Sequence, residues 1–310
     1  MSHAIRRLLA VALTLVLAVG VAPAPTAAQS VGDVDYLVTA SWLAQLGADP
    51  LIVVVDMRAA DAYAQGHIPG AISLPVQTFS LANTDETEVS AWQAKAMDTL
   101  GGAGIGRDHV VVSYDENGNL LAARMRWVMK HLGHERAVVL DGGMSAWTGP
   151  GRELSTEPAT RPATTYMGAA DPARLATWKH VYDRLGNPNV QIIDVRPQPG
   201  YTGEQPGTAK RGGHIPTAMN LDWNNNVQGT APRTFKSVAE LQALYDGLGL
   251  DRSKEIIVYC TTGIQSSNTL FVLEMLGYPN VRLYSGSWSE WGNRDDLPVA
   301  TGLEPGAWPS

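Results

Sequence analysis

Residues 256–276 read IIVYCTTGIQSSNTLFVLEML, and the rest of the chain is organised around them. Residues 256–259 are β-branched and aromatic, which is the composition of a buried strand. Cys260 stands where that strand should end, and the Thr-Thr-Gly that follows should turn the chain. From Ser266 onward, apolar residues recur at helical spacing as far as Gly277, a natural helix C-cap. The pattern predicts a cysteine between the end of a strand and the start of a helix.

Such a position would make the sulfur of Cys260 reactive. Loop N–H groups and the positive end of the helix dipole converge there, which favours a thiolate over a thiol. The thiolate is the nucleophilic form of cysteine. A buried, inert core cysteine is the alternative interpretation. Cys260 is the one cysteine of the chain, which excludes an intramolecular disulfide and any metal site built from several cysteines.

The sequence repeats itself at a domain-sized offset of about 144 residues. Four segments recur in the same order: IVVVDMR (52–58) as QIIDVR (191–196), GHIPGAISLP (66–75) as GHIPTAMNLD (213–222), VVVSYDENG (110–118) as IIVYCTTG (256–263), and LDGGMSAW (140–147) as LYSGSWSEW (283–291). The period is too long for a solenoid and indicates two copies of one fold.

Short strands alternate with amphipathic helices along the mature chain, which predicts an α/β fold of two tandem domains, each a parallel sheet flanked by helices. In the first copy we expect strands at 51–56, 72–74, 110–114 and 138–140, and helices at 41–46, 60–65, 91–100 and 121–132. A Pro-, Thr- and Gly-rich stretch separates the copies. We therefore expect a first domain at 29–150, a linker at 151–165 and a catalytic domain at 166–310.

The N-terminal 30 residues have the pattern of an export signal. Arg6 and Arg7 precede an apolar run over 8–21 that is too short for a comfortable membrane span. Cleavage after Ala28 would make residues 1–28 a signal peptide, and an uncleaved membrane anchor is the alternative. The arginine pair leaves twin-arginine export open beside the general route. We expect a periplasmic or secreted protein with no stable membrane association after cleavage.

The length of 310 residues is consistent with two domains, and the formal net charge is −7. We see no basic cluster in the mature part, so nucleic acid is not expected as a partner. An exported protein meets an oxidising compartment, where the lone thiol has no internal partner.

Taken together, these segments resemble the rhodanese family of tandem-domain sulfurtransferases. The resemblance covers essentially all of the mature chain and is carried by DVR (194–196), GHIPTAMNLDW (213–223), SVAELQALYDGLGLDRSKEIIVYC (237–260) and SGSWSEW (285–291). It implies a cysteine that takes a sulfane sulfur from a small-molecule donor such as thiosulfate and holds it as a persulfide. The sulfur then passes to a thiophilic acceptor such as cyanide or a thiol. No metal or organic cofactor is implied.

The resemblance also implies roles for particular residues. Cys260 matches the persulfide cysteine, Arg196 an arginine that faces an anionic donor, and Trp223 an aromatic wall of the site. The loop whose N–H groups surround the sulfur is matched by five residues, Thr261, Thr262, Gly263, Ile264 and Gln265. The residues that match positions which mainly hold the fold are Asp194, Gly213 and His214.

The donor stays open between thiosulfate and 3-mercaptopyruvate. In the family, thiosulfate enzymes commonly place cations at the second and third loop positions, and mercaptopyruvate enzymes place small residues there. This chain has neutral threonines, Thr261 and Thr262. Arg196 is interpreted either as the donor-binding cation or as one half of an ion pair at the strand end. The threonine hydroxyls could bond an anionic oxygen or merely shape the loop.

Two other function classes fit parts of the pattern. A phosphatase or arsenate reductase needs an arginine that closes the loop onto an oxyanion, but Ser266 stands at that position. No Arg or Lys lies between Cys260 and Gly277, which argues against this class. A non-catalytic sulfur-carrier or binding module would fit the uncharged loop, whereas the retained cysteine argues for an enzyme.

The first copy has Asp115 where the second has Cys260. It therefore lacks a thiol, and we expect it to act as a structural or substrate-shaping partner. His67 and His214 occur in the GHIP turn of both copies, so a shared fold role is favoured over acid–base catalysis. Structural roles are also expected for Ser285, which replaces an aspartate common in the family, and for the tryptophans of the final motifs, Trp147, Trp288 and Trp291.

Overall fold

The computed structural model describes residues 36–116 and 118–308. The first domain contains β1 (Leu37–Val38), α1 (Ala40–Leu46), β2 (Ile52–Asp56), α2 (Ala60–Gln65), β3 (Ile72–Ser73), η1 (Val76–Phe79), α3 (Glu86–Gly102), β4 (Val110–Tyr114), α4 (Leu120–His131), β5 (Ala137–Leu140) and α5 (Gly143–Thr148).

The second domain contains η2 (Pro172–Arg174), β6 (Leu175–Ala176), α6 (Trp178–Tyr182), β7 (Val190–Asp194), α7 (Gln198–Thr202), β8 (Met219–Asn220), η3 (Trp223–Asn226), β9 (Val227–Gln228), β10 (Thr234–Phe235), α8 (Val238–Gly247), β11 (Glu255–Tyr259), α9 (Ile264–Met275), β12 (Val281–Tyr284) and α10 (Ser287–Trp291).

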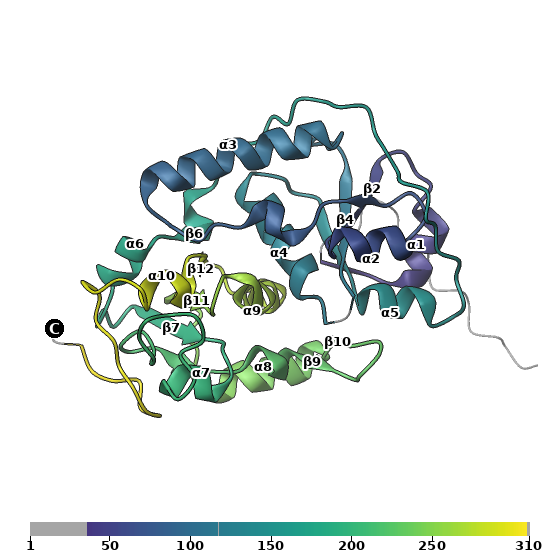
Figure 1. The fold of residues 1–310 in the computed structure, drawn as a ribbon. Coiled ribbons are helices and arrows are strands. Elements are labelled where there is room, and N and C mark those ends of the chain that lie inside the picture. The colour runs from purple at the N-terminus through teal and green to yellow at the C-terminus, as the bar shows by residue number, and fades with distance from the viewer. Residues whose placement is uncertain (1–35, 117, 309–310) are drawn as a thin grey trace, which may run out of the picture.

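The two domains lie beside each other (Figure 1), and their sheets have the same topology. The first five-stranded sheet has the order β1-β5-β4-β2-β3, and the second has the order β6-β12-β11-β7-β8. All neighbouring strands in both sheets are parallel. The predicted duplication of an α/β fold is confirmed. In both sheets the strand that leads to the Asp115 or Cys260 loop is the central one.

Helix α3 is longer than expected. The prediction of a helix over 91–100 was wrong by five residues at its start, because α3 begins at Glu86. Its first turn contains the exposed residues Glu86 and Glu88, which the helix dipole favours. Apolar periodicity could not reveal a polar, solvent-facing first turn. The short antiparallel hairpin of β9 and β10 was also not expected.

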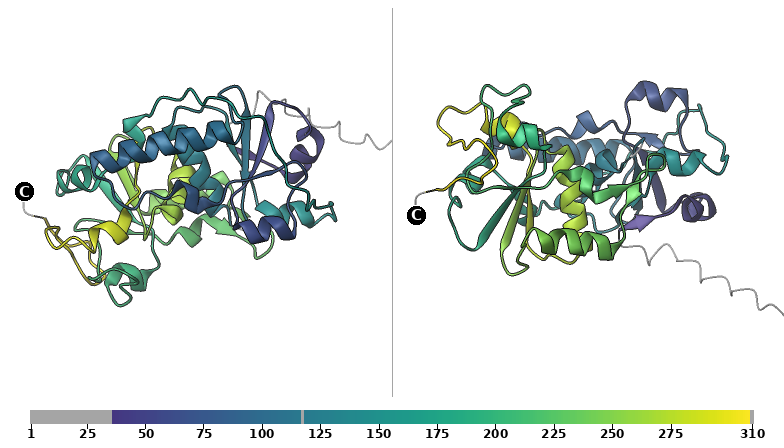
Figure 2. Two further views of the ribbon diagram at one scale, coloured as in Figure 1. Left: turned by 45° about the horizontal axis from the view of Figure 1, so that its top comes forward. Right: turned by 90° about the horizontal axis from the view of Figure 1, so that it is seen from below.

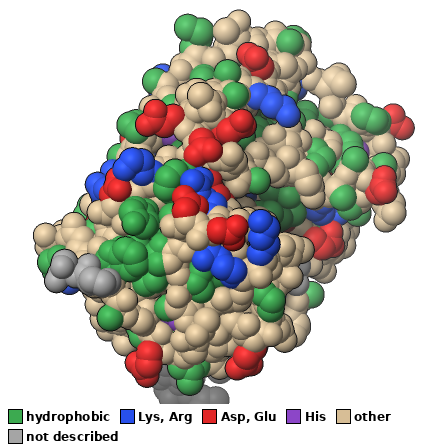
Figure 3. All heavy atoms as spheres, turned by 60° about the vertical axis from the view of Figure 1, so that its left-hand side comes forward, with side chains coloured by type: hydrophobic (Ala, Val, Ile, Leu, Met, Phe, Trp, Pro, Cys, Tyr) green, Lys and Arg blue, Asp and Glu red, His purple; other side chains and the backbone are tan. Residues whose placement is uncertain are grey.

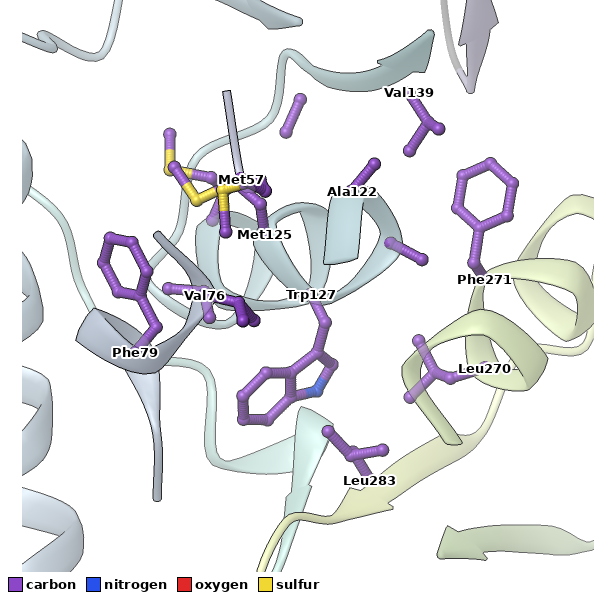
Figure 4. Packing of buried hydrophobic residues seen from close by; sticks show 14 of the residues in the cluster. Met57, Val76, Phe79, Ala122, Met125, Trp127, Val139, Leu270, Phe271 and Leu283 are labelled. Atoms are coloured by element: carbon purple, nitrogen blue, oxygen red, sulfur yellow. The ribbon is translucent and has the colours of Figure 1, made fainter. Parts of the chain in front are cut away.

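A single buried cluster joins the two domains. Alternate residues of a strand point to opposite faces, so Ile52 and Val54 of β2 pack into an outer core of the first domain. Val53 and Val55 instead join a central core, to which the second domain contributes Val258. Figure 4 shows side chains of both domains in this central core: Trp127 comes from the first domain, and Leu270, Phe271 and Leu283 come from the second.

Helices α4 and α9 pack against each other between the sheets (Figures 1 and 2). Polar contacts around them also cross the interface. Ser285 Oγ donates to the carbonyl of Leu81 at 3.1 Å, and the Phe235 N–H donates to Asp141 Oδ1 at 3.1 Å. This pairing brings the N-terminal ends of both helices, and the loops that precede them, to the domain interface.

The expected linker runs along the first domain. Residues 151–165 contain no helix or strand beyond an isolated bridge in which Ser155 pairs with His67. The Thr164 N–H donates to the carbonyl of Gly101 at 2.9 Å. The domain limits at 29–150 and 166–310 stay predictions. The expected signal segment at 1–28 lies outside the described residues.

The surface mixes charges of both signs. On the face shown in Figure 3, acidic and basic side chains are intermingled, with no separation by sign. Within residues 36–116 and 118–308, no helix has the length and apolar character needed to cross a bilayer.

Candidate active site

Cys260 lies where the sequence pattern placed it, directly after β11 and before α9. Its side chain is buried, with 1% of its surface exposed. The helix begins at Ile264, two residues earlier than its apolar spacing indicated, with Gly263 as N-cap at φ 83°. A Cβ on Gly263 would lie 2.8 Å from the carbonyl oxygen of Ser285, so both the backbone angle and the close approach require glycine here.

The sulfur is held by hydrogen-bond donors. The Gly263 N–H donates to Cys260 Sγ at 3.2 Å, and the Ser266 hydroxyl lies 3.5 Å from it. Both groups belong to the start of α9, whose dipole also favours negative charge at this point. Both groups can donate hydrogen bonds to negative charge on this sulfur, the charge that a nucleophilic thiolate carries.

The other predicted loop residues lie around this centre. Thr262 is exposed, whereas Thr261, Ile264 and Gln265 are partly buried. Within the described part of the chain, Gly263 is the one of these five residues whose N–H group bonds the sulfur. The prediction that the whole loop surrounds a transferred sulfur stays a prediction.

The motif of residues 285–291 holds the backbone of Cys260 and Thr261 through hydrogen bonds. The Cys260 N–H donates to Ser287 Oγ at 3.2 Å, and the Trp288 N–H donates to the Cys260 carbonyl at 3.0 Å. The Ser289 N–H donates to the Thr261 carbonyl, also at 3.0 Å. Helix α10 therefore fixes the backbone on which the sulfur is carried.

Arg196 is tied into the strand end. Its Nε donates to both oxygens of Asp194 at 3.0 and 3.1 Å, and its Nη2 donates to Asp194 at 2.6 Å and to the Gly213 carbonyl at 2.7 Å. Its guanidinium also lies over Trp288 at 4.6 Å. Burial disfavours the charge, but Asp194 outweighs burial and raises the pKa of Arg196, so it remains a cation. This geometry supports the ion-pair interpretation, and the contact of Arg196 with an anionic donor stays a prediction.

Trp223 is buried at the start of η3. The guanidinium of Arg233 lies over its ring at 5.1 Å. A Cβ on Gly118, in the loop of the first domain, would lie 3.9 Å from the edge of the same ring. Trp223 therefore faces the first-domain loop, and its predicted contact with a donor stays a prediction.

Arg124, on α4 of the first domain, reaches the loop of the second domain and was missed from the sequence. Its Nη2 donates to Ser285 Oγ at 3.0 Å and to the Phe79 carbonyl at 3.1 Å. Its Nη1 lies 3.1 Å from the point where a Cβ on Gly263 would stand. Burial lowers the pKa of Arg124 to about 10, with the Cys260 charge acting in the opposite direction, so Arg124 is a cation at neutral pH. Its signal in the sequence is a charged residue inside a helix that the fold buries.

The two GHIP histidines have matching packing roles. His67 stacks on Tyr63 and His214 stacks on Tyr201, each with ring centroids 3.7 Å apart. Each Nδ1 lies 2.9 Å from the carbonyl oxygen of the same tyrosine. Their occurrence in both domains agrees with the predicted fold role. Across residues 36–116 and 118–308, no group of three or more His, Cys, Asp or Glu side chains could hold a metal ion.

The chain is similar to known proteins over most of its length. The model of the Rhodanese-like domain matches residues 39–150 and 177–294. A Saccharopolyspora erythraea protein named "Putative thiosulfate sulfurtransferase" is 36% identical over 285 residues, covering 88% of this chain and 99% of that protein. The "Sulfur carrier protein TtuD" of Thermus thermophilus is 35% identical over 286 residues, covering 87% and 98%.

Among solved structures, the chain is similar to SseA from Escherichia coli, described as a 3-mercaptopyruvate sulfotransferase with the rhodanese fold. The TM-score is 0.70 at 30% identity, with 83% of this chain and 100% of that chain covered. The similarity therefore extends over both domains.

Proposed function

The chain belongs to the rhodanese family and is a sulfurtransferase, and on that premise we propose that Cys260 carries the sulfur as a persulfide, taken from thiosulfate and passed to cyanide or a thiol. The observation that supports this most directly is the Gly263 N–H on Cys260 Sγ, at the end of the central strand. A sulfur held by a backbone donor at a helix start is prepared for negative charge.

In the first half-reaction, the Cys260 thiolate attacks the outer sulfur of thiosulfate. A bond forms between the two sulfurs, the bond from the outer sulfur to the sulfonate sulfur breaks, and sulfite leaves with the bonding electron pair. The product is the persulfide anion of Cys260. Negative charge moves outward by one sulfur, toward the loop N–H groups that do not bond the resting sulfur.

In the second half-reaction, an acceptor anion attacks the outer sulfur of the persulfide. The sulfur–sulfur bond breaks, its electron pair returns to Cys260 as thiolate, and cyanide leaves as thiocyanate or a thiolate leaves as a new persulfide. No net oxidation of the protein occurs over the cycle. The two steps share one site, which is the basis of double-displacement kinetics.

A second donor, 3-mercaptopyruvate, is favoured by the neutral loop residues Thr261 and Thr262 and by the likeness to the Escherichia coli structure. The Ser266 hydroxyl beside the sulfur could then relay the proton of the attacked thiol to the departing pyruvate enolate, which leaves the persulfide as an anion. A third role, that of a carrier loaded by another protein, is suggested by the name of the Thermus relative.

Product release without an acceptor separates these proposals. The purified protein is mixed with excess thiosulfate or 3-mercaptopyruvate, and sulfite or pyruvate is measured before any acceptor is added. We expect one equivalent of sulfite per protein from thiosulfate. One equivalent of pyruvate, with no sulfite from thiosulfate, would move the assignment to the second donor. No product from either donor would leave the carrier role.

We also propose that residues 1–28 direct export to the periplasm or the exterior and are removed after Ala28. Support comes from the arginine pair, the short apolar run and the small residues that follow. Cell fractionation with N-terminal sequencing tests this. A mature chain that starts at Gln29 is expected, and an intact N-terminus in the membrane fraction would support an anchor.

A further inference from the structure

The two central helices each reach across to the other domain. Helix α4 follows the N-cap residue Asn119, and α9 follows the N-cap residue Gly263. Arg124 and Asn268 each lie five positions beyond these N-caps. The Asn268 amide donates to the carbonyl of Gly118 in the first-domain loop at 3.3 Å, and Arg124 lies against Gly263 in the second-domain loop. Arg124 and Asn268 therefore occupy equivalent positions, but only Arg124 is charged. This cation faces the domain that carries the cysteine.

Arg124 is an unusual residue for a protein interior. Its side chain is 1% exposed, and no carboxylate forms an ion pair with it among the residues that the structure describes. Its Nη1 is buried without a hydrogen-bond partner. A buried charge without an opposite charge destabilises a fold, so such a group indicates a functional site.

Other charges near the site do not replace Arg124. Arg196 is also close enough for its charge to act on Cys260, but its charge is balanced by the ion pair with Asp194. On the same helix as Arg124, burial lowers the pKa of His131 to about 4, so His131 is neutral at the pH of the reaction. Among the residues that the structure describes, the negative charge of Cys260 opposes the effect of burial on the pKa of Arg124.

We propose that Arg124 is a positioning residue of the sulfurtransferase site: the first domain supplies, through this arginine, the positive charge that holds the thiolate and persulfide anions of Cys260. The proposal rests on the proposed function in that the persulfide is the second anion held. It explains how a loop with Thr261 and Thr262 can work without a cation of its own. It also assigns the cysteine-free domain a part in the chemistry, exerted through the charge of one side chain.

The test measures ionisation of the only cysteine directly. Ultraviolet absorbance of the thiolate is followed against pH, and the same titration of Cys260→Ser is subtracted to remove tyrosine absorbance. In Arg124→Met, which keeps the apolar length of the side chain, half-ionisation should move up by about one pH unit. Arg124→Lys keeps a positive charge and should restore most of the shift.

Arg126→Met is the matched control. Arg126 lies two residues further along the same helix and also crosses the interface, but its partner there is Glu274. Its loss should weaken domain packing and leave the thiolate titration unchanged. Arg124→Met removes a buried charge but also the two hydrogen bonds of Nη2, so the urea midpoint of each variant is measured beside the titration to show that the folded state is being titrated.

The outcomes separate cleanly. An unchanged thiolate titration in folded Arg124→Met overturns the proposal, and so does an equal shift in Arg126→Met. If Arg124→Met does not fold, Arg124→Gln replaces it, with the same two criteria. The titration needs no sulfur donor, so failure of the proposed function would appear separately, as a wild-type protein that releases neither sulfite nor pyruvate.

Discussion

The loops that follow the two central strands, β4 and β11, differ in the side chain that accepts their N–H groups. In the first domain the carboxylate of Asp115 accepts the N–H groups of Asn119, Leu121 and Ala122 at 3.2, 2.8 and 3.3 Å. In the second domain the sulfur of Cys260 accepts the Gly263 N–H. Both loops place an acceptor at the end of a strand and the start of a helix. The first loop has one more residue between the acceptor and the helix N-cap.

The comparison separates what the fold supplies in both copies, a set of N–H donors, from what one side chain supplies in the second copy, the thiol of Cys260. The strand end and helix start create the N–H groups in both copies. In the first copy a carboxylate of the chain itself accepts these N–H groups. In the second, the acceptor is the sulfur of Cys260, the proposed nucleophile. The two copies therefore differ in the acceptor that the loop holds, a carboxylate in the first and a thiol in the second.

The largest effect should come from removing the difference itself. Cys260→Ser should abolish sulfur transfer, because a serine hydroxyl neither ionises near neutral pH nor holds a sulfane sulfur. The change in volume is small, so the fold should remain. Steady-state transfer to cyanide and a thermal melt check both parts. Residual transfer from any donor would show that the reaction does not pass through Cys260.

A second effect compares the two Asp–Arg pairs. Arg58 bonds Asp56 as Arg196 bonds Asp194, so either alanine variant should destabilise its domain by about 3 kcal/mol. The Nη1 of Arg58 bonds Glu116, whereas Arg196 faces a loop without an acid. Arg196→Ala alone should therefore lower kcat/KM for thiosulfate, by about ten- to a hundredfold.

The control for that pair is an uncharged persulfide donor, which Arg196→Ala should affect much less. Equal losses for both donors in steady-state kinetics would mean that Arg196 acts only through the structure. A comparable loss in Arg58→Ala would point to the same conclusion.

Much of the fold and part of the site could be predicted from the sequence. The strand before Cys260, the helix after it and the duplication all depend on local composition and spacing, which the sequence displays directly. The contribution of Arg124 depends on how α4 and α9 pack, which local spacing does not encode. From the sequence, Arg196 was interpreted either as a donor-binding cation or as half of an ion pair, and its bonds to Asp194, two residues before it, support the ion pair.

A smaller effect tests the loop itself. Thr262 is exposed in the second-domain loop, so Thr262→Lys can be accommodated without repacking. The added cation should raise kcat/KM for thiosulfate severalfold, with little gain for an uncharged donor. Kinetics with the two donors check this. If thiosulfate gains nothing, the third loop position does not face the donor.

The smallest effect on chemistry is expected in the first-domain loop. Asp115→Ala leaves three backbone N–H groups without an acceptor and should lower the free energy of unfolding by about 1–3 kcal/mol. The release of sulfite in a single turnover should be nearly unchanged, because the Asp115 carboxylate bonds N–H groups of its own domain. A large fall in that rate at unchanged donor affinity would place Asp115 in the reaction.

The central claim is that the second-domain loop holds sulfur covalently on Cys260. Intact-mass analysis after incubation with thiosulfate or 3-mercaptopyruvate tests it most directly. We predict a gain of one sulfur atom on the wild-type protein, its location on Cys260 by peptide mapping, and its loss when cyanide is added. The Cys260→Ser protein should gain nothing. A wild-type mass that stays unchanged with both donors, or a sulfur gained by Cys260→Ser, would contradict the account.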